Sequence, residues 1–393
     1  MLQVPVRELK EGMIIAQSIY NHHGGSYLVK GQPITKSYIR QLQRIGIQNI
    51  AVTSLDPQFK IMPPEDIVQE KTRINAINKV YDAFEDVRQH EQFDPDMMGD
   101  ISENILFDII NRRDNLVQLT DIRLHDTYTF GHSVNVAILS AMLGLLCHLP
   151  KNELLLLTLG ALLHDLGKIN IPGDILTKPS GLSDDEFSIV KMHPLKGAER
   201  IHNMEHHLPH PVILAAIASE HHEHIDGTGY PRGLKGDKIH PYAKIVAIAD
   251  VYDALTSERP YKKAYTPNIA HNIMTRLNRG QFDPDLLQLF FNNVAIYPEG
   301  TILKTDFGYG IVKHCEFGHT ETPTIVVFAD LEGHVISPET IDLGQTEQGS
   351  KAIQIVIADN ELRHFIHRLS IDPSVYLKDG ADDENTPPAA ARY

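Results

Sequence analysis

The spacing of apolar residues divides the chain into segments that predict different structures. From residue 101 to about residue 295, apolar positions recur every three or four residues. This predicts packed helices, interrupted by the Gly- and Pro-rich stretch 223–241. Residues 65–87 show the same spacing and predict an amphipathic helix within a connector, residues 63–119. The sequence therefore predicts a multidomain, mainly α protein whose largest unit, residues 120–295, is all-α.

The two ends of the chain show other patterns. Residues 1–62 contain short apolar runs at 13–19 and 27–29, which predict two strands around a turn at residues 21–25. A helix that starts after Thr35 and stops before Gly46 follows, so this segment predicts a small α/β regulatory module. Residues 296–370 contain β-branched runs such as 324–328 between glycines and predict a small β-rich appendage. Residues 371–393 end in an acidic and then Pro- and Ala-rich stretch, which is typical of a disordered tail.

Composition narrows the class of partner. The chain has 393 residues, 42% of them hydrophobic, and only two cysteines, Cys147 and Cys315, so we expect a core without disulfides in a reducing compartment. The formal net charge of -15 argues against binding of long nucleic acid. No basic leader occurs, nor an apolar run of the roughly 18 to 20 residues that would cross a membrane. We therefore expect a cytoplasmic protein without a membrane partner. The apolar spacing of the connector helix could also form a seam between two copies of the chain, so a homodimer stays open.

Seven polar side chains interrupt the apolar helical stretches. Buried histidines and carboxylates cost free energy unless they have partners, and any one of the 22 histidines is more often a surface or satisfied core residue. Seven together favour metal binding. Three successive intervals, 165 to 193, 193 to 221 and 222 to 250, are each 28 residues long, about one helix and its return, so each group would project from a different helix. The seven are His132, His164, Asp165, His193, His221, His222 and Asp250.

The chemistry of this set indicates which metals it would hold. Imidazole and carboxylate ligands without a thiolate suit iron or manganese, while nickel, cobalt and zinc stay open. The two oxygens of Asp165 could bridge two ions about 3.5 to 4 Å apart and so activate a bridging water. The sequence therefore predicts two divalent transition metals.

Further residues suggest a phosphate substrate. The glycine-rich loop after His222 allows a ligand to approach the backbone, and its Tyr230 can stack or form a hydrogen bond. Arg259 and Lys262 could grip phosphate oxygens. Lys168 follows His164 by four residues, which would place both on one helix face. Each feature also has a structural interpretation: a turn, a basic helix end, and an ion pair between Lys168 and Asp165.

Four motifs resemble the HD-GYP subgroup of the HD phosphohydrolase superfamily. They are HDLGK at 164–168, HHEHIDGTGYP at 221–231, IADVYDALTS at 248–257 and RPYK at 259–262, and the similarity spans roughly residues 120–295. The first 62 residues look like a small module that often precedes such domains. The resemblance implies an HD-type helical fold and hydrolysis of cyclic di-GMP to linear pGpG, with further hydrolysis to GMP in some members and related cyclic dinucleotides as substrates of others.

The resemblance also implies residue roles. The seven residues above would be metal ligands, Asp165 and Lys168 catalytic, and Tyr230, Arg259 and Lys262 contacts to the dinucleotide, with attack by a metal-bridging hydroxide. Members with three metals have a glutamate where this chain has Tyr128, so we expect two metals and slow hydrolysis of pGpG. Reported family partners are diguanylate cyclase domains. Two alternatives stay open: a cyclic dinucleotide sensor or interaction module without turnover, and another HD nucleotide phosphohydrolase.

Overall fold

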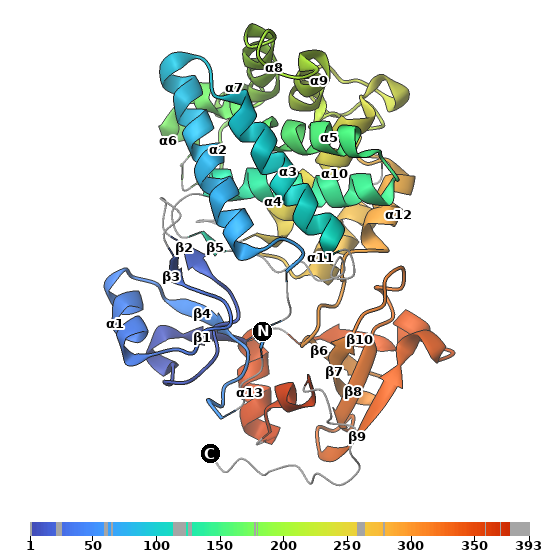
Figure 1. The fold of residues 1–393 in the computed structure, drawn as a ribbon. Coiled ribbons are helices and arrows are strands. Elements are labelled where there is room, and N and C mark those ends of the chain that lie inside the picture. The colour runs from blue at the N-terminus through green and yellow to red at the C-terminus, as the bar shows by residue number, and fades with distance from the viewer. Residues whose placement is uncertain are drawn as a thin grey trace.

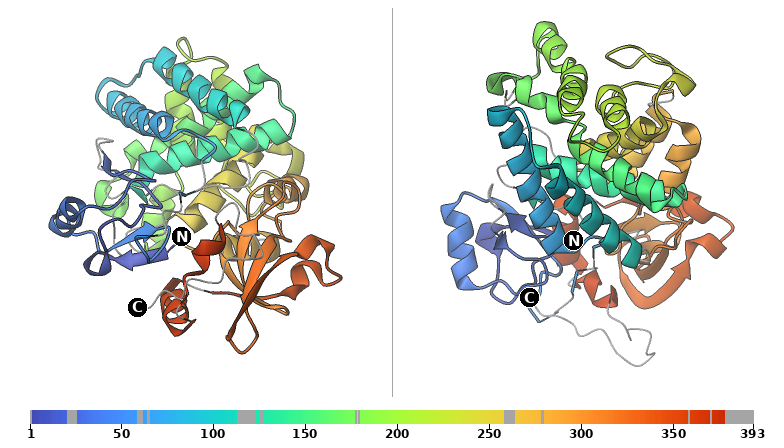
Figure 2. Two further views of the ribbon diagram at one scale, coloured as in Figure 1. Left: turned by 60° about the horizontal axis from the view of Figure 1, so that its bottom comes forward. Right: turned by 45° about the horizontal axis from the view of Figure 1, so that its top comes forward.

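The computed structural model describes residues 2–20, 26–58, 62–63, 66–112, 123–124, 128–176, 178, 180–257, 264–277, 280–357, 359–369 and 371–377. A helical domain forms one half of the molecule, at the top of Figure 1, and both ends of the chain form the other half. The views in Figure 2 show the same division. The expected helical domain and C-terminal β-sheet are therefore both confirmed.

The helical domain is built around long helices that are apolar on several sides. Helix α4 packs against α5 and α10, and one hydrophobic cluster runs from Ile67 to Ile296 through this domain. Helices α2 and α3 lie across one face of it (Figure 1). In the described part of the chain, we find no helix that is both long and apolar enough to cross a membrane. The helices are α2 (Glu70–His90), α3 (Pro95–Asn111), α4 (Tyr128–Leu146), α5 (Lys151–Leu163), α6 (Gly173–Leu176), α7 (Asp184–Val190), α8 (His193–Asn203), α9 (Pro211–Glu220), α10 (Pro241–Thr256), α11 (Pro267–Asn272) and α12 (Pro284–Phe291).

Local sequence explains where several of these helices begin. Asp94 and Asp283 accept hydrogen bonds from backbone N–H groups in the first turns of α3 and α12, and each is followed by a proline that is already suited to the first helical position. Ser183 and Glu186 form a capping box at the start of α7. These caps fix the starts of three helices of the helical domain.

The described part of the N-terminal segment contains short strands, a 3₁₀ helix (Val6–Glu8) and one α-helix. Strand β1 (Leu2–Pro5) pairs antiparallel with β4 (Asn49–Val52), and α1 (Lys36–Arg44) begins after Thr35, whose side chain accepts from the Tyr38 N–H as expected of an N-cap. Gly46 follows α1 with a φ of 79°, a left-handed conformation that favours glycine.

The predicted strand over residues 13–19 is wrong. Only β2 (Ile19–Tyr20) is a strand there, and Ile14 and Ile15 form isolated bridges to Pro33 and Val52. Residues 13–16 are all apolar because all of them are buried, not because a strand alternates between two faces. The second run, residues 27–29, corresponds to β3 (Ser26–Leu28), and the turn expected at residues 21–25 lies outside the described residues.

The N-terminal segment is attached to the helical domain near the start of α4. Strand β2 pairs antiparallel with β3 and parallel with β5 (Arg123–Leu124), which precedes α4. The Tyr20 hydroxyl also donates to the carboxylate of Glu70, the first residue of α2. The N-terminal segment therefore contacts two elements that lead into the helical domain.

The C-terminal sheet has five antiparallel strands in the order β10-β6-β7-β8-β9. The expected strand over residues 324–328 is β8, and the sheet is followed by α13 (Asp359–Leu369) and a 3₁₀ helix, Pro373–Leu377. The strands are β6 (Ile302–Thr305), β7 (Gly308–His314), β8 (Thr324–Ala329), β9 (Val335–Asp342) and β10 (Ile353–Val356).

The two ends of the chain share one hydrophobic core. A single cluster of buried residues includes Leu2 and Ile50 from the N-terminal segment, and Phe328 and Phe365 from the C-terminal one. In Figure 1, α13 (red) lies between the N-terminal segment (blue) and the sheet (orange). Two segments that the sequence predicts to be separate modules are therefore packed together.

Residues 371–377 correct the prediction of a disordered tail. Their buried Asp372 accepts hydrogen bonds from Ser54 Oγ at 2.7 Å, from the Leu55 N–H at 3.0 Å and from the Ser374 N–H at 3.1 Å. Ile371 and Tyr376 are buried in the shared core. The prediction failed because it assigned residues 371–377 to the acidic and Pro- and Ala-rich stretch that follows them, although they include four apolar residues. Residues 378–393 lie outside the described part.

Replacement of Asp372 should therefore loosen both ends of the chain. In Asp372→Ala, the buried N–H of Leu55 and the hydroxyl of Ser54 lose their acceptor, and we expect a loss of about 2 to 4 kcal/mol in the free energy of unfolding. Urea denaturation measures it. Glu316→Ala removes an exposed carboxylate and is the matched control, with a change within about 0.5 kcal/mol. Equal stabilities of the two variants would contradict this role of Asp372.

Candidate metal centre

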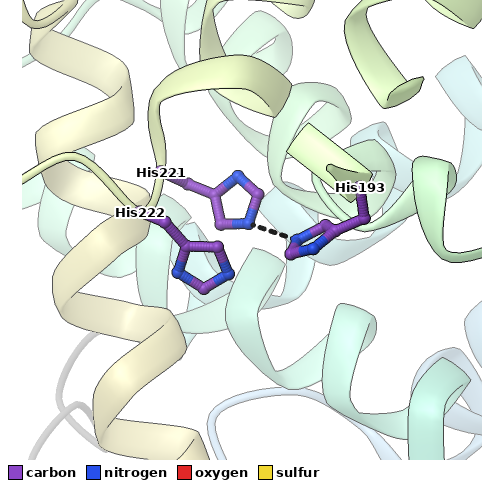
Figure 3. A group of neighbouring side chains, drawn as sticks. All are labelled: His193, His221 and His222. Atoms are coloured by element: carbon purple, nitrogen blue, oxygen red, sulfur yellow. Dashed lines mark hydrogen bonds between the residues drawn. The ribbon is translucent and has the colours of Figure 1, made fainter. Parts of the chain in front are cut away.

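The structure brings all seven predicted residues to one place. His132 lies on α4, Asp250 on α10, and His193 is the first residue of α8. His164 and Asp165 follow α5, and His221 and His222 follow α9. Three overlapping groups of these residues have their ligand atoms within 4.8 Å of one another, and Figure 3 shows one of them, with His193, His221 and His222 pointing toward a common centre.

Three of the imidazoles are oriented by helix ends. Nδ1 of His164, His193 and His221 lies 2.7, 2.8 and 2.9 Å from the backbone carbonyl oxygens of Ala161, Val190 and Ala218, each three residues earlier in the chain. Carbonyls in the last turn of a helix have no partner within it, so they are free to accept these bonds. A carbonyl oxygen only accepts, so Nδ1 carries the proton, and in the neutral ring Nε2 presents a lone pair to the centre.

The sequence places these histidines within helices, and this expectation needs correction. His164 and His221 lie at the C-terminal ends of α5 and α9, and His193 lies at the start of α8 while bonded to the end of α7. Each of these imidazoles bonds to a backbone carbonyl that has no partner within its helix, and such carbonyls exist only at helix ends, so the histidines lie there as well. Periodicity predicts the helices but not these ends to within a residue.

Asp165 lies at the middle of the cluster and is 1% exposed. Its Oδ1 is 3.3 Å from His193 Nε2 and 4.0 Å from His221 Nε2, and its Oδ2 is 3.4 Å from His164 Nε2 and 3.8 Å from His132 Nε2. Burial alone would raise the pKa of Asp165, but the Lys168 ammonium and the surrounding imidazoles hold it well below its usual value. Asp165 is therefore a carboxylate with each oxygen directed at different imidazoles.

Lys168 pairs directly with Asp165. Its Nζ lies 2.5 Å from Asp165 Oδ2, and its side chain is 26% exposed. The expected alignment of Lys168 with His164 on one helix face is wrong because α5 ends at Leu163 and residues 166–170 form a 3₁₀ helix with three residues per turn. The ion pair proposed as the structural interpretation is present, and the lysine remains partly open to solvent.

His132 is held between two carboxylates. Its Nε2 lies 3.0 Å from Asp250 Oδ1, and its Nδ1 lies 2.6 Å from Asp253 Oδ2. Burial alone would lower the pKa of His132, but the two carboxylates raise it to about 9. The sequence interpretation missed Asp253, although it lies in the same motif three residues after Asp250, one turn along α10.

His221 and His222 are uncharged. Burial, with the other imidazoles, holds the pKa of His221 well below its usual value, and burial lowers the pKa of His222 to about 3. The ring of Tyr230 stacks on His222, with ring centroids 4.7 Å apart. Tyr230 therefore lies directly against the cluster.

Two buried atoms in the cluster are unsatisfied. His164 Nε2 and Asp165 Oδ1 have no hydrogen-bond partner among the described residues. His193 Nε2 and His221 Nε2 are 3.3 Å apart, yet both rings use their protons on Nδ1. Lone pairs facing one another in a buried site repel unless a cation lies between them, so this donor set fits divalent metal ions.

Two glutamates that the sequence interpretation missed hold the glycine-rich loop. The buried Glu223 accepts from the N–H groups of Arg232 and Leu234, both at 2.8 Å. Glu220 accepts from the Arg232 guanidinium at 2.6 Å and the His240 N–H at 2.7 Å. The sequence feature that could have indicated such a loop anchor is a pair of glutamates on either side of the two histidines, just before the glycines of the loop. These bonds position Tyr230 over His222.

Not every predicted residue can be placed. Arg259 and Lys262 lie outside the described residues, as does the side chain of Tyr128, the first residue of α4. Their roles stay predictions. The described part of the site consists of the seven clustered residues with Lys168, Tyr230 and the supporting carboxylates.

Comparison with known proteins gives consistent matches. Residues 104–286 match a family model described as HD domain. The chain is 34% identical over 276 residues to "Cyclic di-GMP phosphodiesterase PA4108" of Pseudomonas aeruginosa, which is 70% of this chain and 66% of that protein. It is 40% identical over 157 residues to "Cyclic di-GMP phosphodiesterase response regulator RpfG" of Xanthomonas campestris pv. campestris, covering 39% of this chain and 41% of that protein.

A third relative differs in its named substrate. The "3'3'-cGAMP-specific phosphodiesterase 3" of Vibrio cholerae is 34% identical over 172 residues, covering 44% of this chain and 36% of that protein. The chain thus spans between 36% and 66% of the length of these three relatives.

Close contact between Gly167 and α8 provides a test of the cluster geometry. A Cβ on Gly167 would lie 1.9 Å from the backbone oxygen of His193, so Gly167→Ala must displace α8 and its first residue. We expect a decrease in Tm of about 5 to 10 °C and at least roughly tenfold weaker manganese binding. Gly181→Ala, at an open position, is the matched control. Manganese binding as tight as in the control would contradict the described packing.

Proposed function

We propose that this chain, whose residues 104–286 match the HD-domain family model, belongs to the HD-GYP group and is a metal-dependent phosphodiesterase that hydrolyses cyclic di-GMP to linear pGpG. The observation that carries the proposal is the buried cluster of imidazole and carboxylate groups with unsatisfied lone pairs. It occurs in a chain whose relatives are named cyclic di-GMP phosphodiesterases.

We propose that the cluster holds two divalent ions, iron or manganese, with Asp165 as the shared ligand. The directions of its two oxygens support this role, because Oδ1 faces His193 and His221 while Oδ2 faces His164 and His132. The absence of a thiolate favours these metals over a structural zinc site. The full ligand set is His132, His164, Asp165, His193, His221, His222 and Asp250.

Two ions in such a site supply Lewis acidity toward a phosphoryl oxygen and lower the pKa of a bound water. The chain's own residues bind and orient the substrate. Lys168, held by Asp165 and partly exposed, can donate to a phosphate oxygen from the solvent side of the cluster. Tyr230, stacked on His222, offers a ring and a hydroxyl to the rest of the dinucleotide. Arg259 and Lys262 are the proposed phosphate clamp.

The choice of cyclic dinucleotide rests on the comparisons. The relative that matches 70% of this chain is named for cyclic di-GMP, whereas the one named for 3'3'-cGAMP matches 44%. A guanine differs from an adenine in its hydrogen-bonding edge, so residues beyond the metal cluster must decide between them. We propose cyclic di-GMP as the preferred substrate, with slow further hydrolysis to GMP.

Incubation of anaerobically purified protein, loaded with iron or manganese, with cyclic di-GMP, with 3'3'-cGAMP and, in a separate reaction, with mononucleotides tests this function. We expect pGpG as the main product, and faster turnover of cyclic di-GMP. Separation of products by chromatography distinguishes the alternatives. Binding without product would support a sensor, and hydrolysis of mononucleotides alone would support another HD nucleotide phosphohydrolase.

We propose a cytoplasmic location, because Cys147 and Cys315 are both free, as in a reducing compartment. Residues 1–62 are proposed as a regulatory module, and diguanylate cyclase domains and a second copy of the chain as partners. Because the N-terminal segment shares its core with residues 302–377, a chain beginning near residue 65 would expose apolar surface of the C-terminal sheet. A test of catalysis by the helical domain alone should remove both ends together.

Loss of the Asp165 carboxylate should remove metal and activity together. Asp165→Ala deletes the group that faces four imidazoles, and Asp165→Asn keeps its shape but removes the charge. We expect fewer than half of the wild-type ions per chain in both variants and a loss of at least about a hundredfold in kcat, with the helical circular dichroism spectrum retained. Elemental analysis measures the ions. Full metal content in either variant would contradict the shared-ligand role.

Loss of the proposed phosphate clamp should lower kcat/KM for the substrate without changing the metal content of the protein. A hydrogen bond to a charged group contributes about 1.5 to 3 kcal/mol, so Arg259→Ala should lower kcat/KM for cyclic di-GMP by about 10- to 150-fold. Arg259→Lys should recover part of the loss, because an ammonium lacks the bidentate geometry of a guanidinium. Lys238→Ala, which removes an exposed charge elsewhere, is the control. Unchanged kcat/KM in Arg259→Ala would place the clamp on other residues.

A further inference from the structure

A line of buried and partly buried hydrogen bonds joins helix α2 to the metal centre. Arg73 Nη1 donates to Asn135 Oδ1 at 2.6 Å, Asn135 Nδ2 donates to Asp253 Oδ1 at 2.8 Å, and Asp253 Oδ2 lies 2.6 Å from His132 Nδ1. Arg73 lies on α2, Asn135 and His132 on α4, and Asp253 on α10. Helix α2 ends at His90, before the residues 104–286 that match the HD-domain family model.

We propose that Arg73 is a positioning residue for the metal centre, acting on His132 through Asn135 and Asp253. The inference rests on the proposed metal centre but not on the identity of the substrate. It means that helix α2, which lies outside the matched domain, is part of the apparatus that orients a metal ligand.

The donors and acceptors along the line fix one another. Asp253 accepts the Nδ1–H of His132, so the Nε2 of His132 faces Asp250 and the cluster. Asp253 Oδ1 also accepts from Ser257 Oγ at 2.9 Å, which holds the carboxylate from its own helix. Asn135 can donate from its Nδ2 to Asp253 only when its amide oxygen points away from Asp253. Arg73 Nη1 donates a hydrogen bond to that oxygen and so holds the amide in this orientation.

The positive charge of Arg73 does not by itself explain its contribution to this line of hydrogen bonds. Its guanidinium also pairs with Asp66 at 2.9 Å, and Arg73 is 2% exposed, so its charge is neutralised locally. What it contributes to Asn135 is a donor in a fixed direction, which a planar guanidinium held at two points provides. The role is therefore geometric, and its effect should be on metal affinity.

The alternative is that Arg73 only fastens α2 to α4. A fastening role predicts lower stability with unchanged metal affinity in the protein that remains folded. A positioning role predicts weaker metal binding that depends on Asp253. The two roles are separated by measuring manganese affinity and the unfolding of the metal-free protein on the same variants.

The experiment is a double-mutant cycle on the full chain with manganese as the probe, using isothermal titration calorimetry. Asp253→Asn should weaken manganese binding by roughly 10- to 100-fold. Arg73→Met should weaken it by about 3- to 10-fold, and the double variant should bind no more weakly than Asp253→Asn alone, because both changes break the same line. Arg73→Lys should recover part of the affinity. Arg88→Met, which removes a half-exposed arginine on the same helix, should bind as the wild type does.

The outcomes distinguish a failure of the positioning role of Arg73 from a failure of the proposed metal centre. Wild-type affinity in a folded Arg73→Met protein, or effects that multiply in the double variant, would overturn the positioning role while leaving the metal centre intact. Absence of manganese binding by the wild type would instead overturn the centre itself. If Arg73→Met does not fold, Asn135→Ala removes the same link from within α4, and it must show the same loss of affinity for the inference to stand.

Discussion

Lone pairs of buried imidazoles impose the main constraint on this molecule. His164, His193 and His221 each use their Nδ1–H on a backbone carbonyl, so the Nε2 atoms of three buried side chains meet. Such atoms are costly to bury without a cation or a donor. The rest of the helical domain can be understood as the structure that brings these atoms together and holds them there.

Helix ends and close backbone contacts carry out this positioning. Each of the three carbonyls belongs to the last turn of a helix, where the backbone has unused acceptors. The absence of a side chain at Gly167 lets the backbone after Asp165 approach the start of α8. A hydrophobic cluster that extends from Ile67 to Ile296 keeps these helix ends fixed relative to one another. The site therefore depends on packing far from the ligands themselves.

The sequence predicts the helical domain and which polar residues come together, because seven polar groups in apolar surroundings leave a strong local signal. It does not predict where α5 ends, and so it misplaces Lys168 relative to His164. It also misses Asp253 and Asn135, since an ordinary polar residue on a helix gives no sign of its partner more than a hundred residues away. The buried Asp372, whose partners Ser54 and Leu55 lie near the other end of the chain, is missed for the same reason.

The central claim is that two ions lie among these imidazoles and share Asp165. Anomalous X-ray scattering from crystals of the manganese-loaded protein tests it most directly, because it locates the metals independently of activity. The account predicts two peaks about 3.5 to 4 Å apart, one on each side of the Asp165 carboxylate, with His164 Nε2 and Asp165 Oδ1 as ligands. A single peak, or peaks away from Asp165, would contradict it.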